Sequence, residues 1–125
     1  MNSFFTDLYD FIPSEWKGNF TCSDDNVVVR FVMNITQLTN HITLFGHLLI
    51  DNHSIPLQGS QNTFLRRFTL HNTALITDKM AGKNVSKVTM NGYFSSHDLI
   101  DGSIIFAMDS RNLSCSMQMR KEAGE

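Results

Sequence analysis

Charge is the scarcest property of this chain. Charged residues make up only 18% of the 125 residues, and the formal net charge is −2. So little charge argues against an intrinsically disordered chain and against a coiled coil. Lysines and arginines are spread along the sequence rather than grouped in a basic stripe. We therefore predict no nucleic-acid partner, because neutralising several phosphates requires such a stripe.

Long apolar runs are also missing. The longest, residues 44–50, is interrupted by His47 and is too short to cross a bilayer, so we predict no membrane span. The first residues lack a basic start and include Asp7 and Asp10, which does not resemble a signal peptide. A cytoplasmic location is slightly preferred on this ground, and secretion stays open if a leader was trimmed before Met1.

Asn, Ser and Thr take the places that charge leaves. The 11 Asn, 12 Ser and 10 Thr suit turns and the outer faces of strands better than helix interiors. Five Asn-x-Ser/Thr triplets occur where chance predicts about two, and these are acceptor sequences for N-glycosylation. They begin at Asn19, Asn34, Asn52, Asn84 and Asn112. A chain rich in these residues produces such triplets freely, so chance is the preferred explanation.

Hydrophobic periodicity predicts a single domain over residues 1–125, made mainly of β-strands. Phe4, Leu8 and Phe11 share one face at helical spacing, so residues 1–13 are expected to form a short helix that Pro13 ends. From 14 to 120 the period changes to two, and 121–125 is a tail. Strands are expected near 16–22, 27–36, 42–50, 55–58, 63–70, 73–78, 85–94, 103–109 and 113–120.

Turn residues separate these strands. The predicted turns are Asp24-Asp25-Asn26, Asp51-Asn52, Gly59-Ser60, Ala81-Gly82, Asp101-Gly102 and Arg111-Asn112. Asn91-Gly92 is either a hairpin turn or part of the strand over 85–94. Each strand has one apolar face. We therefore predict an all-β fold, an antiparallel up-and-down meander of about eight strands that forms a barrel, with a β-sandwich as the alternative.

The two cysteines have inward parity on the first and the last predicted strands. In an up-and-down barrel these strands are neighbours, so a disulfide between Cys22 and Cys115 is possible. It would stabilise the fold by about 4–5 kcal/mol in the chain-entropy model. Since the sequence shows no export signal, two reduced and buried thiols are the preferred alternative.

This layout resembles the calycin group, the lipocalin-like and avidin-like small barrels. The resemblance covers nearly the whole chain and rests on a short N-terminal helix, a Trp at the start of the first strand and a meander of about eight strands. Lipocalins carry Gly-x-Trp, whereas this chain has Ser14 at the Gly position and continues Trp16-Lys17-Gly18. In that family the Trp packs against an Arg, for which Arg111 and Arg120 are candidates. The resemblance implies a cavity inside the barrel for a small apolar molecule.

The patterns that mark catalytic and metal sites are weak. His41 and His47 are six residues apart, which is about 20 Å along an extended strand and too far to share an ion, so the histidines are interpreted as surface residues. Most aspartates sit where turns need them, and no nucleophile elbow or phosphate-binding loop is present. We therefore predict no catalytic residues, no metal site and no cofactor, and an enzyme is the least supported class of function.

The most informative oddity is the pair Arg66-Arg67 inside an apolar run. Parity with Phe64 and Phe68 predicts that Arg66 faces inward, where a buried charge is costly unless an anion pairs with it. Arg66 would then bind the anionic group of a ligand whose apolar part contacts Phe31, Met90, Phe106 and Met117. A β-bulge, an edge strand or an internal Asp partner is the alternative.

Two functions follow from these patterns. The first is a non-catalytic binding protein that holds a small amphipathic, possibly anionic molecule inside the barrel. The second is a protein–protein interaction module with a filled core, such as an adaptor, an inhibitor or an immunity-type partner. It draws on the outward parity of Phe45, Leu49, Tyr93 and Ile105, which would form a binding patch or be covered in a homo-oligomer.

Overall fold

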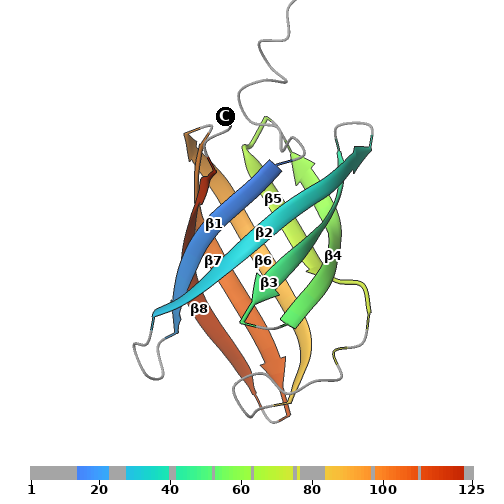
Figure 1. The fold of residues 1–125 in the computed structure, drawn as a ribbon, viewed down its shortest axis with the longest axis vertical. Coiled ribbons are helices and arrows are strands. Elements are labelled where there is room, and N and C mark those ends of the chain that lie inside the picture. The colour runs from blue at the N-terminus through green and yellow to red at the C-terminus, as the bar shows by residue number, and fades with distance from the viewer. Residues whose placement is uncertain are drawn as a thin grey trace, which may run out of the picture.

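Eight antiparallel strands close into a barrel in the part of the chain that the structure describes (Figure 1). This computed structural model describes residues 14–22, 28–39, 42–51, 53–62, 64–74, 76, 84–96, 98–109 and 111–122. The strands are β1 (Ser14–Cys22), β2 (Val28–Thr39), β3 (Thr43–Ile50), β4 (His53–Asn62), β5 (Arg67–Asn72), β6 (Val85–Ser96), β7 (Leu99–Met108) and β8 (Asn112–Lys121). Each strand pairs with the next and β8 pairs with β1. The predicted up-and-down barrel is confirmed, and the sandwich alternative is wrong.

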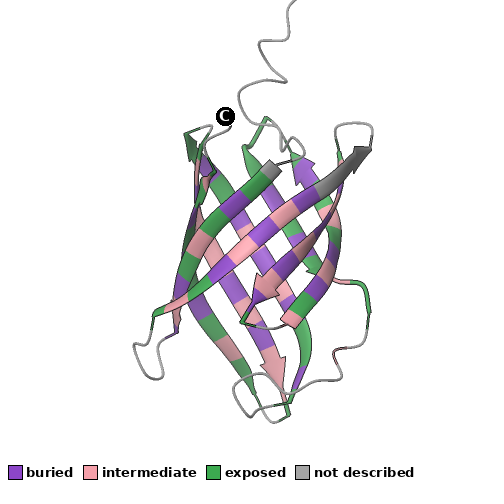
Figure 2. Cartoon of the chain, viewed as in Figure 1, coloured by how far each residue is buried: buried purple, intermediate pink, exposed green. Residues whose placement is uncertain are grey.

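The strands form because polar and apolar residues alternate along them. In β8, for example, Cys115, Met117 and Met119 are buried, and the polar residues between and beside them are exposed. Successive side chains of a strand point to opposite faces, so this alternation separates an inner from an outer surface. Figure 2 shows buried segments alternating with exposed or half-buried ones along the ribbons. The inward apolar side chains of all eight strands meet in one continuous core.

The barrel closes where the first and the last strands meet. β1 and β8 pair in register from Trp16 with Lys121 to Cys22 with Cys115. The backbone N–H of Glu122 also donates to the carbonyl of Glu15 at 2.9 Å. The start of β1 and the end of β8 therefore lie side by side at the upper end of the barrel in Figure 1. The turn between β4 and β5 lies at this same end, because the strands alternate in direction.

Two predicted turns are wrong, and both contain glycine. Gly59-Ser60 lies inside β4 and Asp101-Gly102 lies inside β7. A Cβ added at Gly59 would lie 1.8 Å from the carbonyl oxygen of Thr69, and one added at Gly102 would lie 2.0 Å from that of Asn91. These glycines therefore let neighbouring strands approach closely rather than turn the chain. Asn91-Gly92, left open above, likewise lies inside β6.

Some predicted elements are absent or fall outside the described residues. Of the strand expected over 73–78, the structure describes three residues, and none of them is in a strand: Thr73 and Ala74 form a bend and Ile76 belongs to no strand. Lys121, expected in the tail, is the last residue of β8. The helix expected over 1–13 lies outside the described residues, as do the turns expected at Asp24-Asp25-Asn26 and Ala81-Gly82.

Candidate functional site

The four apolar residues expected to line a ligand cavity all face the barrel interior. Phe31, Met90, Phe106 and Met117 are each 5% exposed or less. They are packed against other side chains: the ring of Phe20 lies 6.0 Å from that of Phe31 and 5.3 Å from that of Phe106, centroid to centroid. Parity therefore grouped these residues correctly. In this structure the group belongs to the hydrophobic core.

The predicted inward orientation of Arg66 is wrong. Arg66 is exposed in the turn Phe64–Arg66 that connects β4 to β5, and its backbone has a positive φ of 58°. The error came from the glycine at 59, which placed the expected turn too early and started the next strand at residue 63. Side chains of a strand alternate between inside and outside with a period of two. This alternation was extended to residues 64–66, which belong to no strand. Phe64, expected inside, is exposed for the same reason.

Trp16 is a core residue near the upper end of the barrel. Its side chain is 1% exposed, and its indole ring meets the ring of Phe94 edge-on at 6.1 Å. Neither candidate for a packed arginine lies in the right place. Arg120 is exposed and has the outward parity of its register partner Lys17, and Arg111 precedes β8 at the opposite end of the barrel. The Trp–Arg contact that the calycin resemblance implies is therefore not formed by these two residues.

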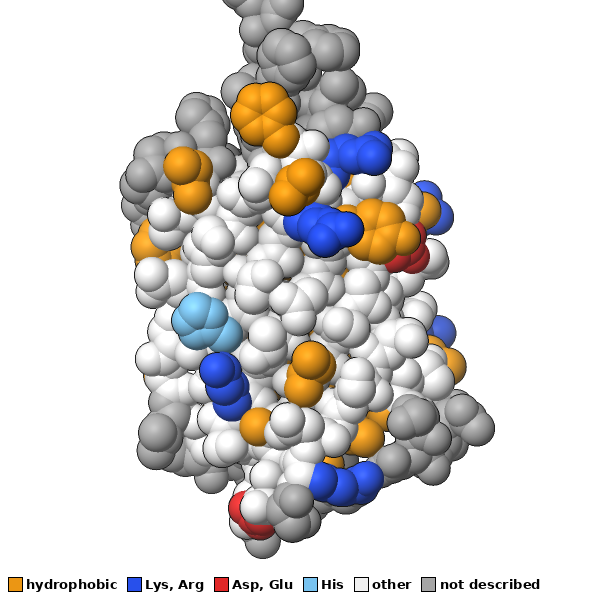
Figure 3. Space-filling model, turned by 180° about the vertical axis from the view of Figure 1, so that it is seen from behind, with side chains coloured by type: hydrophobic (Ala, Val, Ile, Leu, Met, Phe, Trp, Pro, Cys, Tyr) orange, Lys and Arg blue, Asp and Glu red, His pale blue; other side chains and the backbone are white. Residues whose placement is uncertain are grey.

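Exposed apolar residues gather with arginines at the β4–β5 turn. Phe64 is 89% exposed, Leu65 61% and Tyr93 49%. Arg66 and Arg67 are exposed beside them, and Arg67 is the register partner of Tyr93 on β6. We call these five residues the turn surface. Figure 3 views the molecule from behind relative to Figure 1. Near the upper end of this face, large hydrophobic side chains are interspersed with Lys and Arg side chains.

Hydrogen bonds hold the backbone of the turn surface in place. The side-chain oxygen of Asn62 accepts from the N–H of Leu65 at 3.0 Å, an Asn contact typical of turns. The N–H of Phe94 on β6 donates to the carbonyl of Arg66 at 2.9 Å, which ties the turn to the neighbouring strand. Phe64 and Leu65 therefore face water because the turn geometry directs them there. The sequence signal for this turn was Asn62 itself. The residues at 64–68 that follow it do not alternate between apolar and polar, as the residues of a strand would.

A carboxylate lies on the other side of Tyr93. Tyr93 pairs with Asp101 on β7, so the outward side chains of Arg67, Tyr93 and Asp101 form a row across three strands. Asp101 accepts hydrogen bonds from the hydroxyl of Ser95 and from the amide of Gln118, and these bonds hold its pKa below the usual 3.8. The charge on this face is thus positive at the β4–β5 turn and negative beyond Tyr93.

The other outward apolar residues do not join this surface. Phe45 and Leu49 lie on β3, whereas Ile105 lies on β7, four strands away in the closed barrel. All three are half-buried, unlike Tyr93. The binding patch expected from Phe45, Leu49, Tyr93 and Ile105 is therefore wrong as a single patch, and only Tyr93 belongs to the turn surface.

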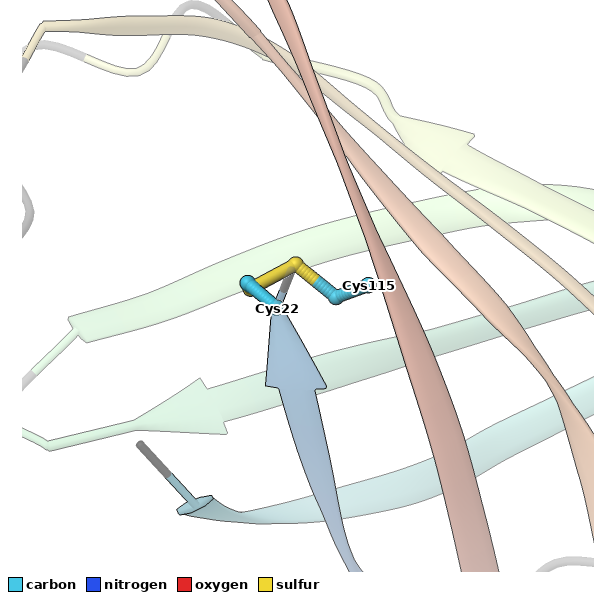
Figure 4. The surroundings of a disulfide bond; sticks show 2 residues. All are labelled: Cys22 and Cys115. Carbon is cyan, nitrogen blue, oxygen red and sulfur yellow. A yellow bond between two sulfur atoms is a disulfide. The ribbon is translucent and has the colours of Figure 1, made fainter. Parts of the chain in front are cut away.

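A disulfide joins Cys22 and Cys115 (Figure 4). The two residues are register partners on β1 and β8, so closure of the barrel brings their Cα atoms to within 4.0 Å. The expected proximity is confirmed. The preferred alternative, two reduced thiols, is not what the structure contains.

Three of the five histidines lie among the described residues. His47 and His53 are half-buried and His71 is exposed, and His47 pairs with Pro56 on β4. His41 and His97 lie outside the described residues. Within the described part of the chain, no three His, Cys, Asp or Glu side chains gather as metal ligands would. That part also contains no helix with the length and hydropathy needed to cross a bilayer.

Comparison with known proteins supports the fold. No family model matches the chain, and no curated protein does. Among solved structures, one described as a redesigned β-barrel is similar, with a TM-score of 0.60 over 89% of this chain and 91% of that one. The two sequences are 13% identical, so the likeness concerns the barrel architecture alone. Any function must therefore be argued from the side chains.

Proposed function

We propose that this barrel is a non-catalytic binding module that recognises a protein partner through the turn surface. The observation that carries the proposal is the 89% exposure of Phe64 beside an exposed Leu65, on a turn held by hydrogen bonds to Asn62 and Phe94. Fully burying a Phe or Leu side chain stabilises an interface by about 1.5–3 kcal/mol. A turn whose backbone is held in place in advance also loses less conformational freedom on binding than a loose loop.

The charges beside Phe64 indicate the chemistry of the partner. Arg66 and Arg67 are both exposed, and arginine with an aromatic residue is a frequent combination at the centre of protein interfaces. Two adjacent cations favour a partner that carries carboxylates around an apolar pocket, because complementary charge raises the association rate and fixes orientation. We therefore expect an acidic partner surface with a hydrophobic pocket that accepts Phe64.

A small amphipathic ligand inside the barrel is the second candidate. It is supported by the interior position of Phe31, Met90, Phe106 and Met117, the residues assigned to that role, and by the arrangement shared with calycin-like barrels. Such a ligand would have to displace side chains, since the rings of Phe20 and Phe106 are already in contact. Arg66, on the outer turn, would not reach it. The turn surface needs no such rearrangement and is the better supported site.

Site-specific photocrosslinking tests the proposal. Benzoylphenylalanine is placed at Phe64 and, as a matched control, at Val28, which is 59% exposed at the opposite end of the barrel. We expect one protein to crosslink at position 64 and not at 28. Binding of that purified protein should weaken about tenfold or more with Phe64→Ala and less with Val28→Ala. Equal crosslinking at both positions, or an unchanged affinity, would refute the proposal.

Two measurements separate the remaining alternatives. Crosslinking at position 64 to a second copy of this chain, with a dimer in sedimentation, would indicate a homo-oligomer and would contradict a foreign partner. Native mass spectrometry of the mildly purified protein tests the internal ligand. A small molecule that is lost on denaturation and retained by Phe64→Ala would support the barrel interior instead.

A further inference from the structure

The acceptor triplets for N-glycosylation coincide with the outward positions of the barrel. In Asn84-Val85-Ser86 the first and third side chains are exposed and the middle one is buried. Asn19-Phe20-Thr21 and Asn112-Leu113-Ser114 also begin with an exposed Asn, and their third residue has the same outward parity. The amide and the hydroxyl that a glycosyltransferase reads therefore lie on the same, solvent-facing side in all three triplets.

The other two triplets are less suitable or not described. Asn34 is half-buried on β2, and the side chain of Thr36, the third residue of its triplet, is outside the described residues. Asn52 is also outside them. The described and exposed acceptor residues are therefore Asn19, Asn84 and Asn112.

The disulfide is an independent observation that points to the same modification. A bond between Cys22 and Cys115 persists in an oxidising compartment and is rare where glutathione keeps thiols reduced. The secretory compartment that oxidises thiols is also the one in which chains are N-glycosylated. Five triplets occur where about two are expected by chance. This excess and the disulfide thus point to the same compartment, and neither observation depends on the other.

We infer that this chain is exported through an oxidising compartment and carries N-linked glycans at Asn19, Asn84 and Asn112. The donor is an oligosaccharide on a polyprenyl diphosphate. The side-chain Nδ2 of each Asn forms a bond to the sugar C1, the bond from C1 to the diphosphate oxygen breaks, and the lipid diphosphate leaves. One amide proton passes to a base of the transferase. No oxidation or reduction occurs in this step.

The local contacts are compatible with the attached sugar. Nδ2 of Asn84 donates to a carboxylate oxygen of Asp109 at 3.1 Å. An amide nitrogen has two hydrogens and loses only one on glycosylation, so Asn84 still has one hydrogen to donate. Asn84 precedes β6 and Asn112 begins β8, at the end of the barrel opposite the turn surface. Glycans at these two positions leave the turn surface around Phe64 open.

Peptide mapping of the protein from its source cells tests the inference. The chain is captured with an antibody raised against the barrel, denatured and alkylated without reduction, and treated with a peptide N-glycanase in heavy-oxygen water. The glycanase converts each glycosylated Asn to a labelled Asp. We expect label at Asn19, Asn84 and Asn112, and no alkylation of Cys22 or Cys115. Unlabelled peptides at all three positions, or alkylated cysteines, would overturn the inference.

Variants that leave the asparagines in place test each assignment. The full chain is expressed behind a cleavable leader in a eukaryotic secretory host, and its mobility is compared before and after deglycosylation. Thr21→Ala, Ser86→Ala and Ser114→Ala should each remove one glycan. Ser116→Ala, an exposed serine of β8 outside any triplet, is the matched control and should change nothing. A variant that keeps its full glycan number overturns the assignment of that site.

Discussion

Cys22 and Cys115 are joined by a disulfide across the one strand pair that closes the barrel. Their sequence separation is 93 residues, so the bond encloses most of the chain. All other pairs in the barrel join strands that are consecutive in sequence. The disulfide therefore fixes the contact that costs the unfolded chain the most conformational entropy to form.

Removing this disulfide should destabilise the protein strongly. We expect Cys22→Ala with Cys115→Ala to lower the free energy of unfolding by about 3–5 kcal/mol, because the unfolded chain regains the entropy of a long loop. Urea denaturation without reductant measures the change. Reductant should weaken the original protein to a similar degree and leave the double variant unaffected. Coinciding midpoints for the original and the variant would contradict the prediction.

Gly59 should not tolerate a methyl group. We expect Gly59→Ala to lower the free energy of unfolding by about 1–3 kcal/mol, since the added Cβ would lie 1.8 Å from the carbonyl oxygen of Thr69. At an open strand position the same change stabilises by about 0.4–1 kcal/mol, so the sign of the effect is decisive. Ser60→Ala, exposed on the same strand, is the control and should change stability by less than about 0.5 kcal/mol.

Arg66 occupies a backbone conformation that glycine adopts more easily. With φ at 58°, Arg66 bears a steric cost of about 1–2 kcal/mol that glycine does not. We expect Arg66→Gly to be more stable than Arg66→Ala by about 1 kcal/mol in thermal or denaturant unfolding. Both variants remove the guanidinium, so the comparison isolates the backbone. Equal stability of the two would show that the turn relaxes out of the left-handed conformation.

Asp101 should make the stability depend on acid pH. Hydrogen bonds from Ser95 and Gln118 lower its pKa below 3.8 in the folded protein, so the carboxylate form favours folding. This contribution is fully present above pH 3.8 and is lost as the pH falls through the lower, folded-state pKa. The free energy of unfolding, measured at a series of acid pH values, should therefore decrease less steeply for Asp101→Asn than for the original protein.

Carbon-detected NMR titration gives a direct check on the cause. Ser95→Ala should move the pKa of Asp101 upward toward 3.8, because the Ser95 hydroxyl is the larger of the two influences. A titration midpoint that stays in place after this substitution would assign the low pKa to another group.

Much of the barrel could be predicted from the sequence, including the turn at Asp51 between β3 and β4, but the roles of Gly59 and Gly102 could not. Alternation in runs such as Leu44 to Ile50 specified which residues are buried, and inward parity on the first and last strands placed Cys22 beside Cys115. Glycine was the source of error, since the same residue turns a chain or lets two strands approach. At Gly59 only the carbonyl of Thr69, ten residues later, distinguishes the two roles, and no local pattern reports it.

The candidate site depended on that one distinction. Because the turn was expected at Gly59 and not at Phe64–Arg66, both Arg66 and Phe64 were predicted to face the interior. The exposed surface that they form was therefore missed. The oxidation state of the cysteines was also beyond the sequence pattern, because it depends on the compartment as well as on proximity. The apolar interior residues, such as Phe31 and Met117, were placed correctly since strand parity alone determines them.

Closure of the barrel also limits how any partner is recognised. A sheet with an open edge offers unpaired N–H and C=O groups, and many peptide-binding domains capture an extended segment by adding it there as another strand. With β8 paired to β1, every strand of this barrel has a neighbour on both sides. A partner must therefore read side chains and turns, and the same closure protects the folded chain from joining others edge to edge.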